Sequence, residues 1–525
     1  MPETRRIGVR PPGLCDDGGV SRPGRLIAFL STLLLILAVE APGGLGATRT
    51  HARAHASASL VAPVVGSAPT SGPLAPGFVG LSMEFYAVHE YTGSDPNAIN
   101  PVLVQLIRNL APGQAPVLRI GGDSTDQTWW PVSGVLPPRG VDYTLTQGWI
   151  RTTAALAKTL GAKLIVGINL MLNQPALAGV EARALLSGLG SSLEAFEIGN
   201  EGDLYAALPW YHTSNNKAIY ARPPSYDIAD FIQDFSDERS AFPPAPVAGP
   251  SFANLPWMSA GLSQFLAAEP GLSLVTFHRY PLRGCNVDPG SPAYPTIANL
   301  LSDYSQSELA QGVAPFVAMA HAQGLQFRVD EMNSVACAGS HGVSDTFASA
   351  LWILDTLFEM ANVGVDGVNI HTLPGARYEL FTFTRDGNTW QADVHPEYYG
   401  MLMFARADPP GSRLLPVTGV PDGALKVWAT LAPNGTIRVV LINEDGSSAQ
   451  SVLLNPPGHS TSATVEQLTA PSIGATDGAT LGGQSFGDGT TTGVLAGPQT
   501  TTVSSLLGLY ALTVPAGSAM MLTLQ

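Results

Sequence analysis

Short apolar runs alternate with longer amphipathic segments from residue 74 to residue 411. Eight of the apolar runs have the length and composition of strands, and they occupy residues 78–85, 116–122, 162–170, 195–201, 245–252, 272–280, 327–333 and 366–372. This alternation predicts repeated β-α units around a parallel sheet. Eight units in a segment of this size are typical of a (β/α)8 TIM barrel. A doubly wound open sheet is the competing architecture, but it would normally need fewer strands and a glycine-rich ligand-binding fingerprint.

Segments between these runs repeat their apolar residues about every 3.6 positions, as helices do. They predict helices at residues 100–111, 147–161, 179–190 and 345–364, the last ending at Gly364 as a candidate C-cap. From residue 412 to residue 525 the pattern changes to period two in a segment rich in Thr, Ser and Gly, broken by turn dipeptides such as Asn434-Gly435 and Asp445-Gly446. This pattern predicts a C-terminal antiparallel β-sandwich domain, to which residues 57–73 would add a strand.

Residues 1–56 have the pattern of a targeting segment. Five arginines precede an apolar run at residues 26–39, and small residues follow, with candidate cleavage positions near Ala47 or after Ala56. The run is short for a membrane-spanning helix. We therefore expect a signal peptide and a processed segment at residues 1–56, and a secreted, extracellular or periplasmic mature chain without stable membrane insertion. A retained signal anchor is the alternative.

Composition and charge narrow the possible partners. Hydrophobic residues make up 45% of the chain and charged residues 13%, which is typical of a packed globular protein. The net charge is −15, only four of the 26 basic residues are lysines, and no basic run occurs after the N-terminal segment. A nucleic-acid partner is therefore disfavoured. Cys285 and Cys337 would form one disulfide in an exported protein, or remain two separate buried thiols.

The active site of a (β/α)8 barrel lies at the C-terminal ends of its strands, so polar residues that close the apolar runs are candidates for chemistry. They are Glu84, Asp123, Asn200, Glu201, His278, Arg279, Tyr280, Asp330, Glu331, Asn333 and His371. Glu201 and Glu331 stand out because two carboxylates facing across a barrel can cleave a glycosidic bond. A separation of about 5 Å favours a retaining mechanism and about 6.5 to 9.5 Å an inverting one. A helix N-cap or a surface ion pair is the structural alternative for each.

Other catalytic signatures are missing from the sequence. It contains no P-loop, no H-E-x-x-H, no G-x-S-x-G and no zinc-type cysteine pattern. We therefore expect neither a cofactor nor a metal.

Four motifs give the chain a family resemblance. "IGNE" at the fourth strand and "VDEMNS" at the seventh, with "LRIGGDST" at the second and "TFHRYPL" at the sixth, resemble clan A glycoside hydrolases. Within that clan the chain resembles family 79, the β-glucuronidases and heparanase-like enzymes, along the whole mature length. The resemblance implies that Glu201 is the general acid/base and Glu331 the nucleophile of a retaining double displacement, with Asn200 bound to the sugar 2-hydroxyl.

The same resemblance implies that Glu84 and Asp123 hold ring hydroxyls. It also implies that Tyr280, His371 and Tyr378 shape the glucuronate end, where phenols and backbone amides bind the C6 carboxylate. Three alternatives stay open at this point. In the first, Arg279 binds that carboxylate instead. In the second, His371 is a core histidine, and in the third, Glu84 pairs with Arg119.

The predicted function is hydrolysis of terminal β-linked glucuronic acid by a retaining exo-β-glucuronidase, whose partner is a glucuronide-bearing glycan or glycoside. No particular oligomeric state is predicted. One alternative is a clan A enzyme for a neutral sugar, such as an arabinofuranosidase or β-xylosidase. An endo-acting heparanase-like enzyme would need basic clusters beside its cleft, which the sequence lacks. A non-catalytic carbohydrate-binding protein would not need both glutamates.

Overall fold

The computed structural model describes residues 60–458 and 460–524, so the predicted targeting segment at residues 1–56 lies outside the described residues. Within the described ranges, no helix combines the length and the apolar character needed to cross a membrane.

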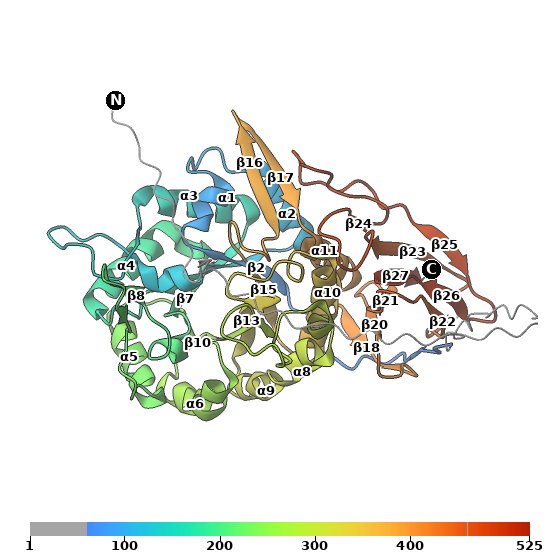
Figure 1. Ribbon diagram of the computed structural model, residues 1–525, viewed down its shortest axis with the longest axis horizontal. Coiled ribbons are helices and arrows are strands. Elements are labelled where there is room, and N and C mark those ends of the chain that lie inside the picture. Colours follow the sequence, from blue (N-terminus) through green and yellow to red (C-terminus); the bar gives the residue numbers. More distant parts are fainter. Residues whose placement is uncertain (1–59, 459, 525) are drawn as a thin grey trace, which may run out of the picture. The chain divides into compact units, whose positions relative to one another are not determined.

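Eight parallel strands close into a barrel in the order β10-β11-β13-β15-β2-β3-β6-β7 (Figure 1). They are β2 (Val79–Glu84), β3 (Val117–Gly121), β6 (Lys163–Ile168), β7 (Leu193–Ile198), β10 (Val247–Phe252), β11 (Leu274–Arg279), β13 (Gln326–Met332) and β15 (Gly367–Thr372). Each coincides with one of the eight predicted runs. The predicted (β/α)8 barrel is therefore confirmed, and the open sheet is excluded because β15 pairs with β2.

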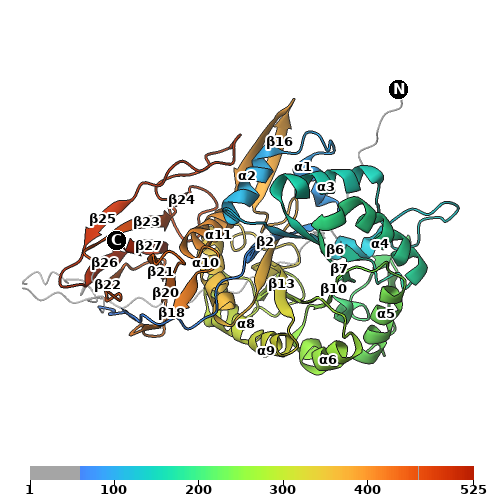
Figure 2. The same cartoon turned by 180° about the vertical axis from the view of Figure 1, so that it is seen from behind.

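Helices surround the barrel on its outside, as Figures 1 and 2 show. They are α1 (Ala87–Thr92), α2 (Pro101–Leu110), α3 (Gln147–Leu160), α4 (Pro175–Leu189), α5 (Ile228–Ser240), α6 (Leu255–Ala268), α7 (Ile297–Leu300), α8 (Ser307–Gln311), α9 (Ala314–Ala322), α10 (Phe347–Asn362) and α11 (Pro396–Ala407). Local signals set several ends: the Asn100 side chain accepts hydrogen bonds from the first turn of α2, and left-handed Gly161 follows α3. Helix α10 ends slightly earlier than predicted, with Val363 as its cap and Gly364 following at φ 86°.

The loops after the barrel strands carry short strand pairs and 3-10 turns. The strand pairs are β4 (Thr128–Trp129) with β5 (Tyr143–Thr144), β8 (Tyr211–His212) with β9 (Ala218–Ile219), β12 (Leu282–Arg283) with β14 (Val335–Ala336), and β16 (Phe381–Asp386) with β17 (Thr389–Val394). The 3-10 helix η1 (Asp123–Gln127) follows β3, and η3 (Gly202–Leu204) follows β7. The strand ends are thus framed by ordered loops, where active sites of this fold are built.

Register shifts occur in the pairing of β11 with both of its neighbours, β10 and β13. Against β11, Phe277 pairs with Val329 and His278 pairs with Glu331, which leaves Asp330 as an extra residue in β13. Ser251 is likewise skipped in the pairing of β10 with β11. A bulge re-aims side chains that would otherwise alternate between two faces. Consecutive residues of β13 can therefore both reach the barrel interior.

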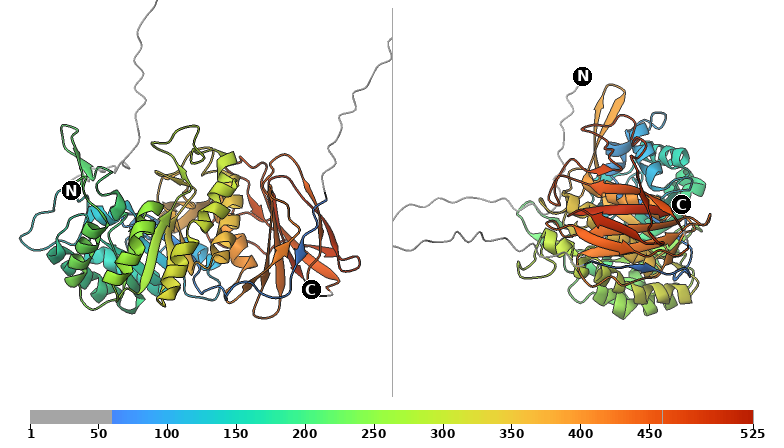
Figure 3. Two further views of the ribbon diagram at one scale, coloured as in Figure 1. Left: turned by 90° about the horizontal axis from the view of Figure 1, so that it is seen from below. Right: turned by 90° about the vertical axis from the view of Figure 1, so that its right-hand side faces the viewer.

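The residues after 412 form antiparallel sheets (Figure 3). The larger sheet contains β18 (Arg413–Leu415), β20 (Leu425–Leu431), β21 (Ile437–Asn443), β27 (Ser518–Leu524), β23 (Ser462–Thr469), β24 (Thr480–Leu481) and β25 (Thr501–Ser504). A second pair contains β22 (Gln450–Leu454) and β26 (Tyr510–Val514). Asn434-Gly435 forms the turn between β20 and β21, with Gly435 at φ 84°. Asp445-Gly446 instead connects strands of different sheets.

The segment before the barrel pairs with this C-terminal region. Strand β1 (Val64–Val65) runs antiparallel to β19 (Val417–Thr418), and Val61 forms a bridge with Val452 of β22. On the other side, Trp428 of β20 stacks on Phe358 of α10 with ring centroids 5.5 Å apart. The Trp428 indole also donates to Asp355 of α10 at 2.7 Å. The barrel and the sheets thus share a packed boundary.

Candidate active site

The predicted site residues all lie at the C-terminal ends of barrel strands or in the loops that follow. Glu84 ends β2, Asp123 begins η1 after β3, Asn200 and Glu201 follow β7, Tyr280 follows β11, Glu331 lies in β13, His371 lies in β15, and Tyr378 lies in the loop after β15. The barrel therefore gathers residues that are up to 294 positions apart in the sequence, counted from Glu84 to Tyr378. Most of them contact one another either directly or through a small set of buried polar side chains.

Glu201 and Glu331 face each other across the mouth of the barrel. A carboxylate oxygen of each lies within 4.8 Å of the other and of a His278 ring nitrogen. His278 Nδ1 is 3.1 Å from Glu201 Oε1 and 3.9 Å from Glu331 Oε2. The imidazole thus bridges the two glutamates.

The backbone at Glu201 adopts a conformation that is unusual for a residue with a side chain. Its φ of 53° and ψ of 50° are left-handed, and Ser251, whose carbonyl accepts the Glu201 amide at 2.9 Å, also has a positive φ of 58°. Strained positive-φ residues cluster at functional sites. Although Glu201 precedes η3, its side chain makes no capping hydrogen bond. The N-cap alternative therefore does not explain this residue.

Glu331 is buried among hydrogen-bond donors. Tyr280 Oη donates to Oε1 at 2.8 Å, and Arg119 Nη1 donates to Oε2 through a short hydrogen bond. Burial alone would raise the pKa of Glu331, but His371, His278 and Arg119 and the Tyr280 hydrogen bond lower it overall. Glu331 is therefore held as an anion, as a nucleophile must be.

Arg119 of β3 is fully buried and connects most of the site. In addition to Glu331, its guanidinium donates to Asn200 Oδ1 at 2.9 Å and to Glu197 Oε2 at 2.7 Å, and it lies 3.2 Å from His278 Nε2. Because an arginine can only donate, His278 Nε2 accepts and Nδ1 carries the hydrogen that points to Glu201. Arg119 and Glu197 were not among the predicted candidates, and His278 was a candidate without an assigned role. The available signal was a charged residue inside a strand that is otherwise apolar, as in "VLRIG" and "LEAFEI".

Glu84 is fixed by the loop after β3. It accepts hydrogen bonds from the Asp123 amide at 3.2 Å and the Ser124 amide at 2.8 Å, and a short one from the Ser124 hydroxyl. Its oxygen lies 3.5 Å from His371 Nε2, while Arg119 pairs with other carboxylates. The alternative pairing of Glu84 with Arg119 was therefore wrong.

His371 and Asp123 lie beside Glu84 but differ in exposure. His371 is buried, and its Nδ1 lies 2.9 Å from the Ser82 hydroxyl and 3.9 Å from Glu331. Burial disfavours the charged ring, but Glu331 and Glu84 together raise the pKa of His371. The Asp123 side chain is exposed. Contact with carboxylates of the site distinguishes His371 from an ordinary core histidine.

Two tyrosines and a disulfide form another part of the rim. The Tyr378 ring centroid is 6.2 Å from that of Tyr280 and 6.1 Å from that of His371. Cys285 and Cys337 form a disulfide between the loops after β11 and β13, which is the first of the two predicted alternatives. Gly339, two residues after Cys337, packs against the Tyr378 ring so closely that an added Cβ would lie 3.1 Å from it.

Arg279 does not reach this site. Its guanidinium lies 5.6 Å from the centroid of the Phe277 ring, which itself packs edge-on against Phe316 of α9 outside the barrel. The alternative in which Arg279 binds the substrate carboxylate is therefore not supported by its position.

Among the residues that the structure describes, two groups of carboxylates and histidine could in principle hold a metal ion. They are Glu201, His278 and Glu331, and Glu197, His278 and Asp330. Arg119 donates to Glu331 in the first group, and in the second it donates to Glu197 and lies 3.8 Å from Asp330. The guanidinium thus supplies both groups with the positive charge that an ion would supply, so we assign a metal to neither.

Comparisons with known proteins agree with this architecture. Residues 427–521 match the model of the "Glycosyl hydrolase family 79 C-terminal beta domain". The chain is 25% identical over 393 residues to a β-glucuronidase of Neurospora crassa and 25% identical over 377 residues to one of Aspergillus niger. These matches cover 65% and 62% of this chain, and the chain spans 65% and 64% of the two relatives.

Solved structures share the fold. A 4-O-α-L-rhamnosyl-β-D-glucuronidase from Fusarium oxysporum superposes with a TM-score of 0.69 at 21% identity, covering 88% of this chain and all of that one. A family 51 arabinofuranosidase from Xanthomonas axonopodis gives a TM-score of 0.61 at 16% identity, covering 89% of this chain and all of that one. At these identities the likeness concerns the fold. Together with the matched C-terminal domain and the two curated relatives, it confirms the resemblance of this chain to the clan A glycoside hydrolases of family 79.

Proposed function

We propose that this chain is a glycoside hydrolase, and specifically a retaining exo-β-glucuronidase that removes terminal β-linked glucuronic acid from glycans or glycoconjugates. The observation that carries the proposal is the approach of the Glu201 and Glu331 carboxylates to within 4.8 Å. A separation of about 5 Å leaves no room for a water molecule between the sugar and the second carboxylate, which favours a covalent intermediate.

In the proposed first step, Glu331 Oε attacks the anomeric carbon while Glu201 gives its proton to the leaving oxygen, so that the glycosidic bond breaks. The Glu331 charge is consumed in the resulting glycosyl ester. In the second step Glu201 takes a proton from a water molecule whose oxygen attacks the anomeric carbon, and Glu331 leaves as the carboxylate. Asn200, whose Oδ1 accepts a hydrogen bond from Arg119, would bond the sugar 2-hydroxyl.

Selectivity for glucuronate is supported by the two relatives that are β-glucuronidases and by the composition of the rim. Arg119 is already engaged with carboxylates, and Arg279 lies on the outside of the barrel. Neutral donors such as the Tyr378 hydroxyl would therefore bind the C6 carboxylate, while Glu84 and Asp123 would accept from ring hydroxyls. Exo action is supported by the absence of basic clusters that could grip a polyanionic chain.

We also propose that the protein is secreted after removal of residues 1–56, and that residues 74–411 form the catalytic domain and residues 412–525 the sandwich domain. The disulfide between Cys285 and Cys337 favours an oxidising compartment.

A panel of 4-nitrophenyl glycosides tests the substrate. The purified chain should hydrolyse the β-D-glucuronide and leave the β-D-xyloside and the α-L-arabinofuranoside intact. Proton NMR of the first product should show the β anomer, because two inversions give net retention. Cleavage of the pentosides without cleavage of the glucuronide would contradict the substrate, and a first-formed α anomer would contradict the mechanism.

Covalent trapping tests the nucleophile. A 2-fluoro-β-glucuronyl inhibitor should label the peptide that contains Glu331, and Glu331→Gln should lower kcat by at least about 10³-fold. Glu194→Gln is the matched control, because Glu194 lies on β7 with a side chain that is 45% exposed. A label on another residue would remove the assignment.

A further inference from the structure

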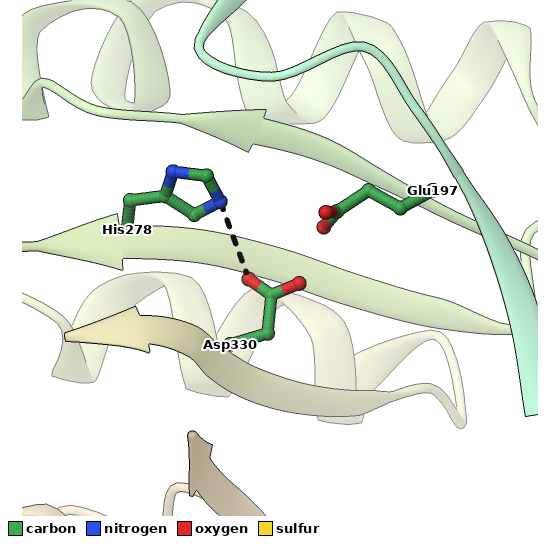
Figure 4. A group of neighbouring side chains, drawn as sticks. All are labelled: Glu197, His278 and Asp330. Atoms are coloured by element: carbon green, nitrogen blue, oxygen red, sulfur yellow. Dashed lines mark ion pairs between the residues drawn. The ribbon is translucent and has the colours of Figure 1, made fainter. Parts of the chain in front are cut away.

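Two buried carboxyl groups lie beneath the proposed catalytic pair and have no role in the mechanism above. Glu197 of β7 and Asp330 of β13 are both fully buried, and Figure 4 shows their carboxyl groups directed toward each other and toward His278. One oxygen of each lies within 4.8 Å of the other and of a His278 ring nitrogen. The bulge in β13 is what brings Asp330 inward next to Glu331.

Positive charge around this pair is limited. Arg119 Nε and Nη2 both lie 2.7 Å from Glu197 Oε2, whereas Arg119 Nε is 3.8 Å from Asp330. Arg328 lies two residues before Asp330, but its guanidinium donates to Asn369 Oδ1 at 2.8 Å and to the Gly77 carbonyl at 2.9 Å. Arg119 must therefore balance nearby carboxylates that include the anionic Glu331.

The hydrogen-bond donors are also limited. Among the described residues, no donor reaches Glu197 Oε1 or either oxygen of Asp330. Ionising a carboxyl group that has no hydrogen-bond donors in a dry interior costs on the order of several kcal/mol. One proton held between the two groups avoids ionising both of them. Burial and repulsion from Glu197 raise the pKa of Asp330 well above its ordinary value. Burial opposes ionisation of Glu197 as well, but the charge of Arg119 lowers its pKa overall.

We propose that Glu197 and Asp330 hold one proton between them, carried by Asp330 and donated to Glu197, and that the pair positions Arg119 and His278 for catalysis. The anionic Glu197 fixes the guanidinium that contacts Glu331 and Asn200. The neutral Asp330 lies 3.7 Å from His278 Nε2 and presents no negative charge to it. His278 therefore keeps its hydrogen on Nδ1, directed at Glu201. Both are positioning residues, since neither touches the reacting atoms.

The proposal predicts that the pair needs one negative charge and tolerates the loss of one ionisable group. Asp330→Asn keeps a neutral donor toward Glu197, so kcat should stay within about threefold of the parent. Glu197→Gln should lower kcat by about tenfold with little change in KM, because Asp330 then ionises but lies farther from Arg119. The double variant has no anion for Arg119 and should lose about 10³-fold, more than the product of the single effects. These kcat measurements use 4-nitrophenyl β-glucuronide, so they rest on the proposed function.

Carbon-13 NMR of protein labelled at the aspartate carboxyl carbon tests the protonation state without any substrate. The parent at pH 7 should show a protonated signal that disappears in Asp330→Asn and moves to the ionised position in Glu197→Gln. An ionised Asp330 signal in the parent, or equal losses of kcat in the two single variants, would overturn the proposal. If no variant or parent cleaves the glucuronide, the proposed function fails, whereas the NMR result still decides the state of the pair. Thermal unfolding of each variant shows that it is folded.

Discussion

Tyr280 and Arg119 donate to different oxygens of the Glu331 carboxylate. Both interactions favour the anion, and the Tyr280 hydroxyl is the one that can be removed without leaving a buried charge unpaired. A hydrogen bond to a charged group contributes about 1.5 to 3 kcal/mol. Loss of the Tyr280 hydroxyl oxygen alone should therefore change the pKa of Glu331, the proposed nucleophile.

Tyr280→Phe should move the acidic limb of the kcat/KM profile to higher pH. The Tyr280 hydrogen bond lowers the pKa of Glu331, so its removal raises that pKa and the anion is lost at a less acidic pH. We expect kcat to fall by about tenfold or more. Tyr378→Phe is the comparison, because its ring lies beside Tyr280 and it should raise KM for the glucuronide without moving the acidic limb. An unchanged limb in Tyr280→Phe would contradict the hydrogen bond as described.

At the scale of elements, η1 ties together three loops at the mouth of the barrel. Asp126 in this turn accepts from the Leu170 and Met171 amides at 3.1 and 3.2 Å through Oδ1. Through Oδ2 it accepts from the Asn200 amide at 3.1 Å and the Tyr205 hydroxyl at 2.7 Å. One carboxylate thus holds the ends of β6 and β7, and with them the position of Glu201.

Asp126→Ala should destabilise the protein and slow catalysis together. Several buried donors lose their acceptor, so we expect a loss of about 3 kcal/mol in the free energy of unfolding, measured with urea. A shift of the Asn200–Glu201 loop by about 1 Å could reduce kcat by about 10²-fold. Asp142→Ala, at an exposed position in the same connection, is the control and should change neither quantity. Full activity of Asp126→Ala would show that the loop is held by other contacts.

At the scale of the whole molecule, several carboxyl groups have raised pKa values because burial disfavours their charged form. The pKa is raised to about 6 for Asp126 and Asp355, about 7 for Asp203, Glu359 and Asp408, and about 8 for Glu181 and Glu238. Asp355 and Glu359 lie at the boundary between α10 and the sheets, where Lys426 pairs with Asp303 at 2.7 Å. The protein therefore buries more acids than it has cations to balance.

The Tm should be higher near pH 5 than near pH 8. A carboxyl group with a raised folded-state pKa contributes stability that is fully present below its unfolded value, about 4, and is lost as pH rises through its folded value, here about 6 to 8. Glu331 and Glu197 have lowered pKa values and act in the opposite direction only below about pH 4.5.

Scanning calorimetry between pH 5 and pH 8 measures the direction in which the Tm changes. One variant tests whether a buried carboxyl group causes the change. Asp355→Asn keeps an acceptor for the Trp428 indole but cannot ionise, so it should reduce the decline in Tm. Asp488→Asn, an exposed site, should leave the decline unchanged. A Tm that rises from pH 5 to pH 8 would contradict this account.

Local patterns in the sequence determined much of this molecule. Each strand of the barrel is an apolar run of its own, because a strand buried on both faces has to be apolar along its length. Glu201 and Glu331 were found because their carboxylates close such runs, where this fold places its chemistry. The Asn434-Gly435 hairpin followed from the positive φ that its turn requires.

Only the tertiary structure decided how the polar residues are connected. Arg119, Glu197, His278 and Asp330 come from four different strands, and a bulge that period-two alternation does not predict turns Asp330 inward. The extent of α10 and the outward direction of Arg279 likewise depend on packing. Sequence patterns indicate which positions are buried, because apolar residues repeat with the period of the helix or strand that buries them. Which buried charges meet is set by strand order and register, which are properties of the closed barrel.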